Sequence, residues 1–119
     1  MKKITFLIIF LSSNTSMSMN FDGYYKLSDC DSGRFSIVIK KINERSYFNI
    51  FDKKIIIKKG WVKFEKNLIR ESRVIKLGNI EGELHNKNIV IQNYGNSMNE
   101  YIHFTQCDNK YLNFIKQEN

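Results

Sequence analysis

The sequence predicts an all-β domain: a small antiparallel meander closed as a barrel of about eight strands, or a β-sandwich, preceded by a signal peptide. Three observations favour this fold class. Apolar and polar residues alternate in short segments, turn-forming residues separate these segments at hairpin spacing, and two cysteines lie near opposite ends of the predicted sheet. The chain of 119 residues has the size of one domain. Closure is expected because it removes the exposed edges that a flat sheet would present.

The start of the chain has the three parts of a secretory signal. Met1-Lys2-Lys3 is basic, residues 4–11 are apolar apart from Thr5, and residues 12–18 are small and polar apart from Met17. As a helix the apolar run would span about 12 Å, against about 30 Å of membrane hydrocarbon, so no stable membrane anchor is expected. We therefore predict a signal peptide at residues 1–18 and a single all-β domain at residues 19–119.

Period-two alternation places the expected strands. In the clearest of them, Phe35, Ile37 and Ile39 share one face. Gly60 is expected to mark a bulge or sharp bend between two strands. The expected strands comprise residues 24–28, 35–40, 48–50, 55–57, 61–64, 74–77, 80–85, 89–93, 101–107 and 111–115.

The two cysteines, Cys30 and Cys107, predict one disulfide. Export places them in an oxidising compartment, the bacterial periplasm or the outside of the cell, where an even pair in a small domain is typical of a disulfide. The closed loop of 78 residues would stabilise the fold by about 4.5 kcal/mol in the chain-entropy model. Because Cys30 ends the first expected strand and Cys107 one of the last, this bond would hold the two ends of the sheet together.

Positive charge is concentrated in the middle of the chain. The formal net charge is +7, and residues 40–76 hold twelve Lys or Arg against four acids. The chain is rich in Lys, Ile and Asn, as expected of an AT-rich coding sequence, which accounts for part of this excess. The rest favours an acidic protein partner or an anionic envelope polymer. The lysines assigned to partner binding are Lys53, Lys54, Lys58 and Lys59.

Aromatic residues among these lysines, Tyr47, Phe51, Trp61 and Phe64, also fit a nucleic-acid platform. Export argues against that partner, and no nucleic acid is predicted. Trp61 and Phe64 are expected in the core instead.

Catalytic and metal-binding patterns are weak. Glu81 and Glu83 would project from one strand face about 6.6 Å apart, a separation found in glycosidases, yet any alternating acidic strand gives it. His103 and Cys107 would lie about 13 Å apart on a straight strand, too far for a nucleophile and its base. The spacing of His and Cys does not match a zinc site, and no cofactor motif is present. We predict no catalytic residue, no metal and no cofactor.

The loop after residue 92 is the other predicted binding element. Asn93, Gly95 and Asn96 suit a turn because they tolerate positive φ. A turn does not explain Tyr94 and Met98, an amphipathic ring and a flexible thioether of the kind that anchors a partner. Tyr94, Asn96 and Met98 are therefore assigned to partner binding.

The segments Gly78-Asn79-Ile80-Glu81-Gly82 and IVIQNYGNSMNEYIHFTQCDNKYLNFIK, with QNYGNSMN and HFTQC as their distinctive parts, resemble a group of uncharacterised small exported bacterial proteins. The resemblance implies an exported domain with a single disulfide and brings no known activity.

These observations predict a non-enzymatic periplasmic binding protein, namely an immunity or inhibitor protein that blocks a secreted toxin or hydrolase. One alternative is a small lipocalin-like or avidin-like barrel that holds an apolar ligand, which inward Phe and Ile side chains would exclude if they fill the interior. Another is a cell-wall hydrolase that uses Glu81 and Glu83.

Overall fold

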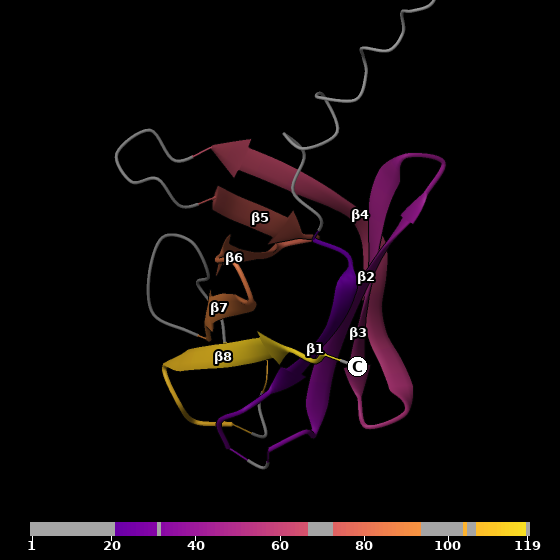
Figure 1. Ribbon diagram of the computed structural model, residues 1–119. Helices are drawn as coiled ribbons and strands as arrows, with labels where there is room; N and C mark the ends of the chain where they lie inside the picture. Colours follow the sequence, from indigo (N-terminus) through magenta and orange to yellow (C-terminus); the bar gives the residue numbers. More distant parts are fainter. Residues whose placement is uncertain (1–20, 31, 67–72, 94–103, 105–106, 119) are drawn as a thin grey trace, which may run out of the picture.

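The computed structural model describes residues 21–30, 32–66, 73–93, 104 and 107–118 (Figure 1). The predicted signal peptide, residues 1–18, lies outside the described residues. Eight antiparallel strands form a closed barrel in sequence order. They are β1 (Gly23–Leu27), β2 (Phe35–Ile42), β3 (Arg45–Asp52), β4 (Ile55–Lys66), β5 (Arg73–Leu77), β6 (Ile80–Leu84), β7 (Asn88–Gln92) and β8 (Tyr111–Lys116). The last strand pairs with the first, which confirms the predicted barrel.

Two-residue turns set the register of three hairpins. Asn43 and Glu44 join the paired residues Ile42 and Arg45, and both have positive φ, 54° and 68°. Positive φ at both central positions belongs to the type I′ turn, whose twist matches that of the flanking strands. Lys53-Lys54 connects β3 to β4 and Gly78-Asn79 connects β5 to β6 in equally short turns.

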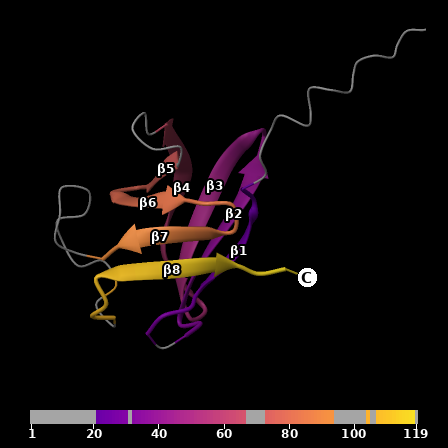
Figure 2. The same cartoon turned by 60° about the vertical axis from the view of Figure 1, so that its left-hand side comes forward.

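Inward-facing residues fill the barrel. On β6, for example, Ile80, Gly82 and Leu84 are buried and the two glutamates between them are partly exposed, as the alternation predicts. Figure 2 shows β5, β6, β7 and β8 as the side of the barrel that faces the long β2 and β3. The buried apolar residues are Tyr25, Leu27, Phe35, Ile37, Ile39, Phe48, Ile50, Ile75, Leu77, Ile80, Leu84, Ile89, Ile91, Phe104, Cys107, Leu112 and Phe114.

Strand β4 departs from the prediction. It is one continuous strand of 12 residues, and the register shift lies opposite Ile57 rather than at Gly60. Lys58 pairs with Ile50 and Ile56 with Phe51, which leaves Ile57 as the extra residue. Gly60 keeps its partner in the ladder, Phe48. The expected break at Gly60 is therefore wrong: the glycine lies under the Phe48 ring, whose Cε1 is 3.5 Å from where a Cβ would be.

The closure region, which comprises Asn93, Phe104, the two cysteines and β8, also differs from the prediction. Phe104 and Cys107 were expected in a strand, but neither is, because the Cys107 N–H donates to the Phe104 carbonyl at 2.9 Å and turns the chain. The rest of that expected strand lies outside the described residues. The disulfide between Cys30 and Cys107 is present, with their Cα atoms 5.8 Å apart. It joins the segment after β1 to the segment before β8, as predicted.

Asn93 holds the closure region in place. It is fully buried, its side-chain amide donates to the Cys107 carbonyl at 2.8 Å, and its side-chain oxygen accepts from the Phe104 N–H at 3.0 Å. Its own backbone N–H donates to the Lys110 carbonyl at 2.6 Å. Asn93 does not have the positive φ that was expected to explain it, and its side chain instead replaces the backbone partners that this irregular segment lacks.

Within the part of the chain that the structure describes, no helix is long and apolar enough to cross a membrane.

Candidate functional site

The β3–β4 hairpin brings the four predicted partner-binding lysines together. Figure 1 shows this hairpin as the long pair of strands β3 and β4. Lys53 and Lys54 form its turn, and Lys58 and Lys59 follow on β4. None of the four forms an ion pair with another described residue. Uncompensated charge of one sign on a short hairpin attracts an acidic partner.

Side-chain and backbone hydrogen bonds with Arg34 hold the turn end of this hairpin in place. The Arg34 guanidinium binds the Asp52 carboxylate through two nitrogens, at 2.9 and 3.2 Å, and the Lys53 N–H donates to the Arg34 carbonyl at 2.6 Å. Bidentate pairs of this kind fix orientation as well as adding energy. Asp52, the acidic residue nearest to the lysines in the sequence, is therefore paired with Arg34. Lys53 and Lys54 lie on a turn that these contacts hold in place.

Three consecutive isoleucines lie between the two pairs of lysines and are exposed. Ile55 exposes 69% of its surface, and Ile56 and Ile57 each expose 47%. The sequence pattern predicted only a strand at these residues. Their lack of alternation was the available signal, because a half-buried strand alternates and this one does not. We call residues 53–59, Lys-Lys-Ile-Ile-Ile-Lys-Lys, the basic segment.

Trp61 and Phe64 are not core residues: they are 39% and 40% exposed, which overturns the expectation. For Trp61 the reason is register, since it pairs with Tyr47 on the outer face of the sheet. Phe64 instead pairs with the buried Ile75 and lines an open pocket. The Tyr47 ring meets the indole edge-on at 5.0 Å, and the Arg45 guanidinium lies over it at 4.1 Å from the ring centre. We call Arg45, Tyr47 and Trp61 the Trp61 cluster. It combines three residue types that dominate the energetics of protein interfaces.

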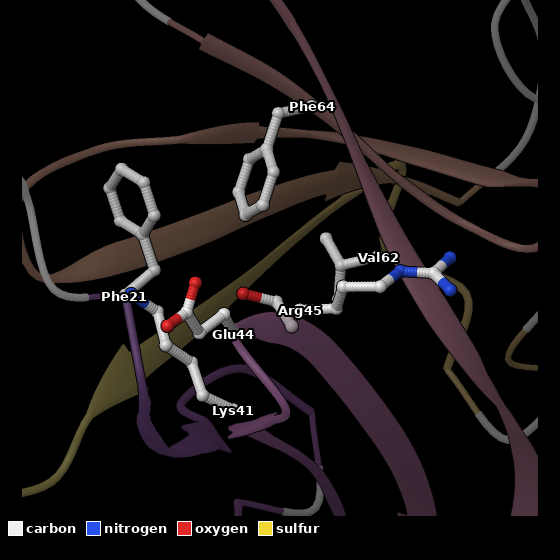
Figure 3. Close-up of a pocket in the computed structure, with 7 residues that line it drawn as sticks. Phe21, Lys41, Glu44, Arg45, Val62 and Phe64 are labelled. Carbon is white, nitrogen blue, oxygen red and sulfur yellow. The ribbon is translucent and has the colours of Figure 1, made fainter.

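A pocket opens on the other side of β4, at the end of the barrel. Its volume is about 340 Å³, and the Phe21 and Phe64 rings, 5.3 Å apart, form its apolar wall together with Val62. Figure 3 shows the Glu44 carboxylate directed toward the two rings, whereas the Arg45 guanidinium points away. The remaining lining residues are Lys41 and Ser46. The pocket is therefore amphipathic and of a size that suits a small ligand or one side chain of a partner.

The predicted carboxylate pair, Glu81 and Glu83, lies on the outer face of β6. Glu81 contacts the Lys76 ammonium at 3.5 Å, and Glu83 contacts His85 at 3.4 Å. Lys76 also binds Glu65 at 3.0 Å, and this hydrogen bond is the main reason that the pKa of Lys76 is raised. Both glutamates thus contact a basic side chain on the outer face, whereas an acid catalyst needs a carboxyl group made less acidic by burial.

The other predicted residues cannot be placed. Tyr94, Asn96 and Met98, assigned to partner binding, and His103 lie outside the described residues. Cys107 is bonded to Cys30 and has no thiol. Among the residues that the structure describes, no three His, Cys, Asp or Glu side chains are placed to hold a metal ion.

Comparison with family models, with curated proteins and with solved structures found no significant match.

Proposed function

We propose that this protein is an exported binding protein without catalytic activity, which captures an acidic protein in the periplasm or outside the cell as an immunity or inhibitor protein. The observation that carries the proposal is the basic segment, where three exposed isoleucines lie between two pairs of lysines on one hairpin. The disulfide is consistent with an oxidising compartment.

The energetics of this surface suit an interface. Fully burying an isoleucine side chain contributes about 1.5–3 kcal/mol, so covering three that are half exposed would contribute several kcal/mol. An exposed apolar patch rimmed by charge is typical of a site that another molecule covers. The lysines would speed the encounter with an acidic partner, and the Trp61 cluster on the same hairpin would add a preformed anchor.

The test is capture from an envelope extract of the source bacterium with tagged mature protein. We expect an acidic protein to be retained at low salt and released as salt rises. Lys54→Glu with Lys59→Glu should weaken capture at least about tenfold. The matched control, Lys87→Glu with Lys110→Glu, makes the same change of charge on the β7–β8 side and should leave capture unchanged. Retention that is indifferent to both salt and Lys54/Lys59 reversal would refute the proposal.

A second candidate function is the binding of a small amphipathic ligand, now at the mouth of the barrel. Large Ile, Leu and Phe side chains occupy the interior, which argues against a ligand inside, but the pocket at Phe21, Val62 and Phe64 favours one at the end. Native mass spectrometry of protein purified from its source should then show a co-purified small molecule. Val62→Trp, which narrows the pocket, should remove that molecule, and its persistence would exclude this site.

A hydrolytic function through Glu81 and Glu83 is the least favoured. It requires that Glu83→Gln abolish cleavage of an envelope polymer by the purified protein, and protein that cleaves no such polymer would dispose of it.

A further inference from the structure

The N-terminal part of β4 is paired with a neighbouring strand on one side only. Residues 55–61 pair with β3, whereas β5 pairs with β4 only from Val62 onward. In the part of the chain that the structure describes, no other strand or backbone hydrogen bond covers the second side of residues 55–59. In an antiparallel ladder alternate residues direct their N–H and C=O away from the partner. The barrel therefore keeps a short open edge here, within the basic segment.

The upper limit of this edge is visible in the contacts of Lys58. Its stem runs along the β5–β6 turn, with Cδ 3.4 Å and Nζ 3.5 Å from the place a Cβ would take at Gly78. The turn therefore flanks β4 at that level, and the open edge extends downward from there past the isoleucines to the Lys53-Lys54 turn.

Side chains along the edge specify what could pair with it. The pattern Lys-Lys-Ile-Ile-Ile-Lys-Lys is symmetrical, with an apolar centre and a basic pair at each end. A complementary strand is extended, apolar at its centre and acidic at both ends, and the symmetry suits either strand direction. Peptide recognition by strand addition has this form: main-chain hydrogen bonds give affinity, and alternate side chains give specificity.

Another copy of this chain is a poor occupant. Two basic segments side by side would oppose lysine to lysine, and like charges directly opposite each other destabilise a strand pair. Edge lysines and a bulge, here at Ile57, are also common protections against self-association. The lysines would not repel an acidic strand, whose charges are opposite to theirs.

We propose that the open edge of β4 binds an extended acidic segment of the partner as an added strand. This inference rests on the proposed function, since it specifies how the basic segment would hold its acidic partner. The partner's backbone would donate to and accept from residues 55–57, while its acidic side chains meet the lysines and its apolar centre covers the isoleucines.

The test uses a synthetic peptide, Ser-Glu-Glu-Val-Thr-Val-Glu-Glu-Ser, labelled for fluorescence anisotropy. Two further peptides carry N-methyl groups on alternate central residues, one on the odd and one on the even positions. An added strand hydrogen-bonds through only one of these two sets. We therefore expect one methylated peptide to lose at least about tenfold in affinity and the other to bind within about threefold of the parent. The Lys54→Glu/Lys59→Glu variant should not bind the parent.

Several results would overturn the inference. They are equal affinity of the two methylated peptides, whether both bind or both fail, and no binding of the parent peptide at about 1 mM. A protein dimer in sedimentation that is altered by Lys54→Glu/Lys59→Glu would also overturn it, because the edge would then be occupied by a second copy.

The two proposals can fail separately. If the peptides fail but capture from the envelope extract still depends on Lys54 and Lys59, strand addition is wrong and the binding function stands. If the peptides bind in one register but the extract yields nothing, the binding function is refuted while the edge remains a strand acceptor.

Discussion

The closure region and the basic segment depart in opposite ways from the usual rule that polar side chains are exposed and apolar ones are buried. In the closure region a polar side chain, Asn93, is fully buried and its amide meets backbone partners on both sides, next to a disulfide. In the basic segment the apolar side chains of residues 55–57 are exposed between lysines that form no ion pair with another described residue. The first arrangement stabilises an irregular stretch of chain, and the second contributes little to the isolated fold. This contrast indicates that the stability of the barrel and the binding proposed for it would depend on different parts of the molecule.

Removing the disulfide should have the largest effect on stability, without removing the proposed binding. Cys30→Ser with Cys107→Ser is expected to lower the free energy of unfolding by about 4 kcal/mol, because the reduced chain regains the freedom of the 77-residue separation. Urea unfolding measures the loss, and the wild-type protein in reductant serves as a second measurement should the variant not accumulate. Well below its midpoint, the variant should still bind the acidic peptide. An unchanged midpoint would show that strand pairing alone closes the barrel.

A matched pair of isoleucines sharpens the contrast. Ile37 is fully buried and Ile56 is half exposed, so Ile37→Ala should cost about 3 kcal/mol of stability and Ile56→Ala less than about 1 kcal/mol. Binding of the acidic peptide should show the reverse order. Urea unfolding and anisotropy on the same two variants provide both measurements. A loss for Ile56→Ala equal to that for Ile37→Ala would mean that the basic segment is part of the core.

Replacing the buried amide tests the closure region by itself. Asn93→Ala leaves the Phe104 N–H and the Cys107 carbonyl without this partner, and we expect it to cost about 2–3 kcal/mol. Asn88→Ala is the control, since its amide donates to the partly buried Asn113 side chain at 2.7 Å, and it should cost about 1 kcal/mol or less. Equal costs at the two positions would remove the special role of Asn93.

Much of the closure could be predicted from the sequence, and little of the binding surface could. Alternation located the strands because one face of each is buried, and two cysteines allow only one pairing. The exposure of Trp61 depends on its register opposite Tyr47, which a bulge at Ile57 separates from the hairpin turn, and alternation cannot count across a bulge. The role of Asn93 depends on hydrogen bonds to Phe104 and Cys107, which lie 11 and 14 residues further along the chain.

The lysines of the basic segment were predictable from the sequence, but the open edge beside them was not. Charge alone identifies the cluster, whereas the open edge depends on where β5 ends, at Leu77 opposite Val62. Pairing of that kind is set by the length of a neighbouring strand and the position of its turn. A single sequence gives turn positions only to within a few residues.

The smallest expected effect concerns pH and the buried Tyr25 on β1. Burial, followed by the negative charge of Asp22, raises the pKa of Tyr25 to about 12, and its hydroxyl donates to the Phe21 carbonyl at 2.8 Å. An unfolded tyrosine titrates near pH 10, so between about pH 10 and 12 the unfolded chain binds fewer protons than the folded one, and stability falls as pH rises. Urea midpoints measured from about pH 9 to 12 should therefore decline.

Tyr25→Phe should flatten that decline, although it lowers the midpoint at pH 9 slightly by removing the hydrogen bond to Phe21. Lys76→Met is the matched control, because the pKa of Lys76 is also raised, by Glu65, and the stability that Lys76 contributes is likewise lost as pH rises. If Tyr25→Phe keeps the full decline and Lys76→Met removes it, the alkaline sensitivity belongs to the ion pairs on the outer face of β4–β6. The buried hydroxyl would then have no measurable share in the stability of the closed barrel.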